Sequence, residues 1–120
     1  MIKKNKFKRK GKTMELLKLS FEENTLTAKL SGDLDHHGAS AVRELIDDEM
    51  YRVRPDTLNL DLGDVEFMDS SGLGLILGRF TKASEIGTGV IISNPSQRTR
   101  RLLTLVGVDK MINITEVENK

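Results

Sequence analysis

The sequence predicts an α/β fold, a single domain in which a mixed β-sheet of about four to five strands packs against about three helices. Two segments with alternating apolar residues precede the first helix and are separated by a short polar turn, which indicates a β-hairpin. The remaining segments alternate between helix and strand periodicity. A length of 120 residues suits one domain with one modest core.

The predicted hairpin joins residues 14–21 to residues 25–31, because apolar and polar residues alternate in both segments. A helix is expected over residues 38–52, where apolar side chains recur at spacings of three and four. Asp35 precedes this helix at the position of an N-cap, which a short polar side chain favours.

The centre of the chain is a strand, a turn and a second helix. Residues 57–62 alternate between apolar and polar side chains, which predicts a strand with one face on the core. A helix is predicted over residues 73–86 from a stripe of buried positions at spacings of three and four: Leu73, Ile76, Leu77, Phe80 and Ala83. Asp69, Ser70 and Ser71 lie between the two elements, where short polar side chains cap free backbone N–H groups. A helix cap is therefore one interpretation of these residues.

This second helix also carries Gly72, Gly74 and Gly78. An interior glycine costs roughly 1 kcal/mol relative to Ala, so their presence calls for a reason. At about 100° per residue, Gly74, Leu75 and Gly78 fall opposite the buried stripe. We expect a smooth outer face with one exposed leucine, on which another backbone or helix can dock. The alternative is close packing on a neighbouring element of the same chain.

The rest of the chain continues the alternation. Residues 90–92 form an apolar run typical of a buried strand. Asn94 and Pro95 predict the cap and first turn of a helix that reaches about Leu105. Residues 111–115 predict one more short strand.

Composition excludes several classes of protein. The chain has no cysteine, so neither a disulfide framework nor a thiolate metal site is possible. His36 and His37 are the only histidines and are adjacent, so they point to different sides, and we expect no metal and no cofactor. The basic start is not followed by an apolar run, and no apolar stretch of about 18 residues occurs. We therefore expect a soluble, cytoplasmic protein.

The net charge of +1 conceals an asymmetry between the first residues and the rest. Seven of the 19 basic residues and none of the 18 acidic ones fall in residues 1–13, which leaves a net charge of −6 for residues 14–120. A basic run with so little apolar surface predicts a disordered tail over residues 1–13 that precedes a domain over residues 14–120. The alternative is that this run binds nucleic acid or anionic lipid.

The motifs argue against an enzyme. Residues 68–72 read MDSSG, so neither Ser70 nor Ser71 stands in a GxSxG nucleophile motif, and no histidine follows to act as base. The glycines of the second helix miss the GxGxxG spacing because Leu77 occupies the third position, and no GxxxxGK[ST] motif occurs. We expect no catalytic residues.

Two stretches resemble a known family. Residues 67–79, FMDSSGLGLILGR, resemble the signature of the bacterial anti-sigma factor antagonists, which are small STAS-domain proteins of the sporulation-regulator type. Residues 30–37, LSGDLDHH, resemble the loop between second strand and first helix in the same proteins. The likeness runs in order over residues 14–114. Relatives usually continue into a final helix, but only residues 116–120 remain here, so we expect that helix to be missing or very short.

The resemblance implies a function in partner switching, the control of transcription through exchange of binding partners. The unphosphorylated antagonist would bind an anti-sigma factor that is also a serine kinase, and the sigma factor would be released. Phosphorylation of Ser70, with Ser71 as the runner-up, would end the binding, and a serine phosphatase would restore it. The partner surface expected from the loop and the glycine-rich helix comprises Asp33, Asp35, His36, Asp69, Ser70, Ser71, Gly72, Gly74, Leu75 and Gly78.

Two alternatives remain open from the sequence. One is a different STAS role, such as a scaffold subunit of a stress-signalling complex. The other belongs to a different class, nucleic-acid binding through the basic run, which would weaken steeply with salt.

Overall fold

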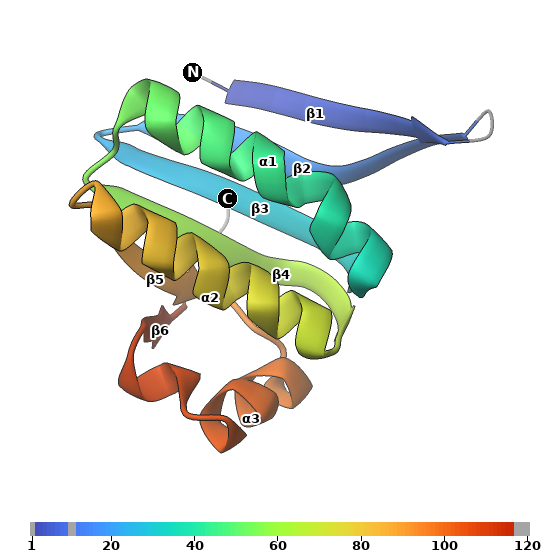
Figure 1. Ribbon diagram of the computed structural model, residues 1–120. Coiled ribbons are helices and arrows are strands. Elements are labelled where there is room, and N and C mark those ends of the chain that lie inside the picture. The colour runs from blue at the N-terminus through green and yellow to red at the C-terminus, as the bar shows by residue number, and fades with distance from the viewer. Residues whose placement is uncertain (1, 10–11, 117–120) are drawn as a thin grey trace.

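The computed structural model describes residues 2–9 and 12–116. Six strands form one sheet in sequence order, namely β1 (Ile2–Arg9), β2 (Lys12–Glu22), β3 (Thr25–Leu34), β4 (Thr57–Met68), β5 (Gly89–Ser93) and β6 (Asn113–Thr115). The helices are α1 (His36–Val53), α2 (Ser70–Glu85) and α3 (Gln97–Leu105), followed by a 3-10 turn, η1 (Val108–Lys110). Figure 1 shows α1 and α2 side by side on one face of the sheet and α3 near β5 and β6.

The sheet is mixed. The pairs β1–β2 and β2–β3 are antiparallel, whereas β3–β4, β4–β5 and β5–β6 are parallel. Each parallel pair is joined by a segment that contains a helix, as parallel strands require. The predicted α/β class, mixed sheet and three helices are therefore confirmed. The sheet has six strands rather than about four to five, because β1 adds a strand at its edge.

The core lies between the sheet and the two helices that cover it. Alternate residues of the central strands turn toward α1 and α2 and are fully buried: Leu26 and Leu30 on β3, Leu58, Leu60 and Leu62 on β4. From α1, Val42, Ile46 and Met50 complete this layer and are fully buried as well. Burial of one such side chain contributes roughly 1.5–3 kcal/mol, so this layer is the main source of stability.

The start of the chain differs from the predicted tail. Ile2–Arg9 forms a strand that pairs antiparallel with β2, with a shift of register between Asn5 and Phe7. The tail prediction considered only the scarcity of apolar surface, but a strand edge also offers unpaired N–H and C=O groups, and lysine-rich segments are typical of edge strands. Residues 1, 10 and 11 lie outside the described residues. The domain boundary after residue 13 stays a prediction.

The start of α3 also corrects a prediction. Ser96, not Asn94, caps this helix, because Ser96 Oγ accepts a hydrogen bond from the Thr99 N–H at 3.1 Å. Asn94 adopts a left-handed φ of 60°, which asparagine tolerates, and its N–H donates to the Thr115 carbonyl at 2.9 Å. It therefore forms the turn that leaves β5. The prediction about the final helix falls on residues 117–120, which lie outside the described residues.

A buried ion pair joins α1 to α2. Arg79 Nε lies 2.8 Å from Asp47 Oδ1, and the two side chains are 3% and 12% exposed. Burial raises the pKa of the Asp47 carboxyl and lowers the pKa of the Arg79 guanidinium, and each shift is opposed by the charge of the partner. Nothing in the sequence pattern indicates this pair, because its members lie on different helices.

Amide hydrogen exchange distinguishes strand β1 from a disordered tail. We expect the β1 amides that bond to β2 to exchange more slowly than those of an unstructured peptide. The amides of β3 and β4 should exchange more slowly still, because edge strands open more readily than central ones. The matched control is a chain that begins at Met14, in which the β2 edge should exchange faster. Exchange over residues 2–9 at the rate of an unstructured peptide would instead support the tail.

Candidate functional site

The register of two parallel strands brings two helix starts together. Leu34 on β3 lies opposite Met68 on β4, and each is the last residue of its strand. Asp35 follows the first strand and Asp69 follows the second, so each helix begins after an aspartate. Figure 1 shows the first turns of α1 and α2 at the same end of the sheet. The two predicted motifs thus meet at one edge.

Both aspartates cap their helices. The Gly38 N–H donates to Asp35 Oδ1 at 3.0 Å, and this hydrogen bond lowers the pKa of the Asp35 carboxyl. The Ser71 N–H donates to Asp69 Oδ1 at 2.8 Å. The predicted cap at Asp35 is confirmed. At α2 the cap is Asp69 rather than either serine.

The two serines differ in exposure. Ser70 is the first residue of α2 and is exposed, whereas Ser71 is half-buried. Within the described residues no hydrogen bond involves the Ser70 hydroxyl, so the capping interpretation does not apply to it. The structure therefore presents a free hydroxyl at a helix N-terminus, where the backbone carries partial positive charge.

The glycines of α2 serve two different purposes. A Cβ added to Gly74 or Gly78 would meet nothing within 4 Å, so close internal packing does not explain either glycine. A Cβ on Gly72 would lie 2.6 Å from Met68 Cγ and 2.8 Å from the Leu34 carbonyl oxygen. Gly72 is buried where α2 crosses the ends of both strands, so it offers no exposed surface of its own to a partner.

The prediction that Leu75 is exposed is wrong, because its side chain is only 4% exposed. The predicted stripe assumed that α2 is buried only against the sheet, but α2 also packs on α1. The buried sector is therefore displaced toward α1. Its members are Gly72, Leu75, Ile76, Arg79 and Ala83, while Leu73, Leu77 and Phe80 are half-buried.

A hollow of about 270 Å³, here named the interhelix hollow, lies between the first turns of α1 and α2. Its lining residues are His36, Ala39, Ser40, Arg43, Ser71, Gly74 and Leu75. Ser40 and Arg43 were not among the residues predicted from the sequence. Their helical spacing from His36 indicates a shared face of α1, but only the packing decides that this face turns toward α2.

Of the remaining predicted residues, His36 lines the interhelix hollow and Asp33 does not. Asp33 and His36 are exposed, and Asp33 lines a second hollow with Asp35, His37 and Glu66. The rings of His36 and His37 lie 5.8 Å apart with an angle of 65° between their planes. Within residues 2–9 and 12–116 there is no group of three side chains able to hold a metal ion.

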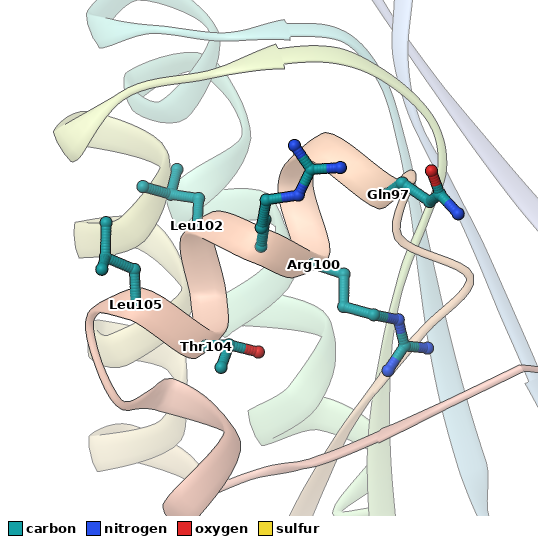
Figure 2. A pocket seen from close by; sticks show the side chains of 6 residues that line it. Gln97, Arg100, Leu102, Thr104 and Leu105 are labelled. Atoms are coloured by element: carbon teal, nitrogen blue, oxygen red, sulfur yellow. The ribbon is translucent and has the colours of Figure 1, made fainter.

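A third hollow, of about 640 Å³, lies along α3 and was not expected from the sequence. Figure 2 shows Leu102 and Leu105 on one side of this helix and Gln97 at its start. The Leu105 side chain is 82% exposed, and Arg100 Nη2 lies 3.6 Å from Glu116 Oε2. This surface lies on another helix than the predicted site.

Two glycine substitutions should affect stability in opposite directions. Gly72→Ala should lower the free energy of unfolding by about 1–3 kcal/mol, because the added methyl group overlaps Met68 and Leu34. Gly74→Ala, the matched control on the same helix, should raise it by about 0.5–1 kcal/mol, because an exposed helical glycine costs about that much. Denaturant unfolding measures both. Equal effects of the two changes would contradict the division between packing and surface glycines.

Comparisons with known proteins agree with this geometry. The STAS domain model matches residues 17–120. An anti-sigma F factor antagonist of Paenibacillus polymyxa is 33% identical over 102 residues, which cover 85% of this chain and 87% of the relative. An anti-sigma-B factor antagonist of Listeria monocytogenes is 32% identical over 92 residues, which cover 76% of this chain and 79% of the relative.

Solved structures extend the likeness to the fold. The anti-sigma factor antagonist SpoIIAA in its unphosphorylated form matches with a TM-score of 0.74 and 27% identity, over 86% of this chain and 89% of that one. SpoIIAA of Bacillus in its phosphorylated form matches with a TM-score of 0.69 and 27% identity, over 86% and 92%. Within the described residues no helix is long and apolar enough to cross a membrane. The chain belongs to the STAS domain family, and within it to the anti-sigma factor antagonists of the SpoIIAA type.

Proposed function

We propose that this protein binds an anti-sigma factor serine kinase when it is unphosphorylated, which releases the sigma factor, and that phosphorylation of Ser70 ends the binding. The observation that carries the proposal is the exposed Ser70 hydroxyl at the Asp69-capped start of α2, next to the open glycine positions 74 and 78. The existence of a phosphorylated form of a structural relative supports it.

The electrostatics of the site explain how a phosphate acts as a switch. A phosphate adds roughly −1.5 to −2 charge at pH 7. At Ser70 this charge lies beside the Asp69 carboxylate on a domain whose residues 14–120 already carry a net charge of −6. The helix N-terminus stabilises the anion in part, so the fold tolerates it. A partner that must approach closely meets both the added bulk and the repulsion.

The proposed contact surface has two parts. Asp69, Ser70, Ser71, Gly74 and Gly78 contribute from α2, and Asp33, Asp35 and His36 contribute from the adjoining loop and the start of α1. Gly72 and Leu75 support this surface from beneath, because both are buried. Ser71 is the second candidate for modification, and its half-burial favours Ser70.

The cellular setting follows from this role. The protein acts in the cytoplasm as a regulatory binding module rather than as an enzyme, as the names of its relatives also suggest. A serine phosphatase removes the phosphate and restores binding. Incubation with candidate anti-sigma kinases and ATP, followed by intact-mass and peptide analysis, tests the assignment: one phosphate on the peptide that contains Ser70 is expected.

Substitution of Ser70 separates a switch from a structural residue. Ser70→Ala should block phosphate uptake yet keep kinase binding and stability, because its hydroxyl caps nothing. Ser70→Asp should bind the kinase about tenfold or more weakly, because a fixed charge beside Asp69 repels the partner. Ser96→Ala is the matched control: it removes a genuine serine cap and should cost about 0.5–2 kcal/mol of stability.

Denaturant midpoints and kinase affinities of the three variants give the answer. A Ser70→Ala variant that loses stability and binding together, while Ser70→Asp behaves like the wild type, would show that Ser70 is structural.

Gly78→Gln tests whether the open side of α2 contacts the kinase. A Cβ at this position would meet no atom within 4 Å, so the free energy of unfolding should stay within about 1 kcal/mol of the wild type. Kinase affinity should fall, because close approach of the partner requires a low surface there. Ser84→Gln, at an exposed position near the end of α2, is the control and should bind normally. Unaltered binding by Gly78→Gln would remove Gly78 from the interface.

A further inference from the structure

The interhelix hollow adjoins the proposed contact surface. Ser71 and Gly74 belong to both, so a protein that covers the start of α2 also covers this hollow. Arg43 reaches it from α1, one turn beyond Ser40 and two turns beyond His36. A partner that docks here must therefore fill the hollow or leave it as an empty gap, which forfeits packing contacts.

The charge of the hollow differs from that of the domain. Arg43 is the only lining residue that is always charged, and no Asp or Glu lines the hollow. Residues 14–120 carry a net charge of −6, so the charge at this hollow is opposite in sign to that of the domain.

Arg43 has one acidic neighbour a turn away, Asp47, and the charge of Arg43 is among those that oppose the rise in the pKa of that carboxyl. Asp47 lies one turn farther along α1 but is ion-paired with Arg79. Within the described part of the chain no ion pair involves Arg43, as is also true of the exposed Arg54, Arg98 and Arg101, but Arg43 alone among these four lines the interhelix hollow. The hydroxyls of Ser40 and Ser71 add donors beside it. Together these groups suit a carboxylate, which accepts hydrogen bonds from both guanidinium and hydroxyl.

We propose that Arg43 is a specificity-determining residue that receives an aspartate or glutamate side chain of the partner kinase in the interhelix hollow. This inference rests on the proposed function, because the occupant belongs to the kinase. A guanidinium binds a carboxylate with two parallel hydrogen bonds, so the pair fixes the orientation of the partner as well as adding attraction. It distinguishes the matching kinase from kinases with a neutral or basic residue at that place.

The probe is the purified anti-sigma kinase that phosphorylates the wild-type chain fastest among a panel of candidates, and its affinity is measured without ATP so that no phosphate is transferred. Arg43→Glu should weaken its affinity about tenfold or more, because like charges then meet across the interface. Arg98→Glu is the matched control: it makes the same change of net charge at an exposed position on α3 and should stay within about twofold of the wild type. Arg43→Gln, which keeps the shape without charge, serves if Arg43→Glu does not fold.

A second arm identifies the kinase residue. Each surface Asp and Glu of the kinase is replaced by Lys in turn, and one of these variants should restore binding to Arg43→Glu while binding the wild-type chain poorly. The assignment of Arg43 would be overturned if Arg43→Glu bound the kinase as tightly as the wild type, or if Arg98→Glu lost as much affinity. It would also be overturned if no kinase variant restored binding. If inorganic phosphate competed with the kinase for the wild-type chain but not for Arg43→Glu, and no kinase variant restored binding, the hollow would be a phosphate site instead.

Failure of the proposed function is recognised separately. A wild-type chain that binds no kinase in the panel and takes up no phosphate would overturn that function together with the role of Arg43. A wild-type chain that is phosphorylated at Ser70 while Arg43→Glu binds normally would overturn the role of Arg43 alone.

Discussion

Parallel pairing of β3 with β4 brings Leu34 opposite Met68, and the candidate site depends on that register. Because both strands end at the same edge, both following helices begin there, and Asp35 and Asp69 cap them at neighbouring positions. Gly72 makes the arrangement possible, since any Cβ at this position would overlap the ends of both strands. A shift of register would separate the free hydroxyl of α2 from the loop before α1.

The ion pair between Asp47 and Arg79 joins the two helices near their middle. Removal of one member of a buried pair leaves the other charge uncompensated, which costs about 3–5 kcal/mol in proteins studied by substitution. The pair also engages Asp47, the acidic neighbour of Arg43 on α1, so the arginine at the interhelix hollow stays available. A structural contact in the middle of the helices thereby influences the charge presented at their start.

The free hydroxyl of Ser70 and the two open glycines, Gly74 and Gly78, share one property. None of them is needed by the chain itself: Ser70 caps nothing, and a Cβ at position 74 or 78 would meet no atom within 4 Å. Because the fold does not require these residues, binding of an external partner is the better explanation for them. Gly72 is the opposite case, although it stands two residues from Gly74 and looks the same in the sequence.

The sequence by itself determined the α/β class, the order of the central elements, the Asp35 cap and the two motifs that identify the family, because periodicity and capping are local properties. Tertiary structure decided which side of α2 is buried, since α1 as well as the sheet covers it, and this reversed the prediction for Leu75. It also decided that Arg43 faces α2 and that Ile2–Arg9 pairs with an open strand edge. Helical periodicity shows which residues share a face, but contacts between distant segments decide what that face meets.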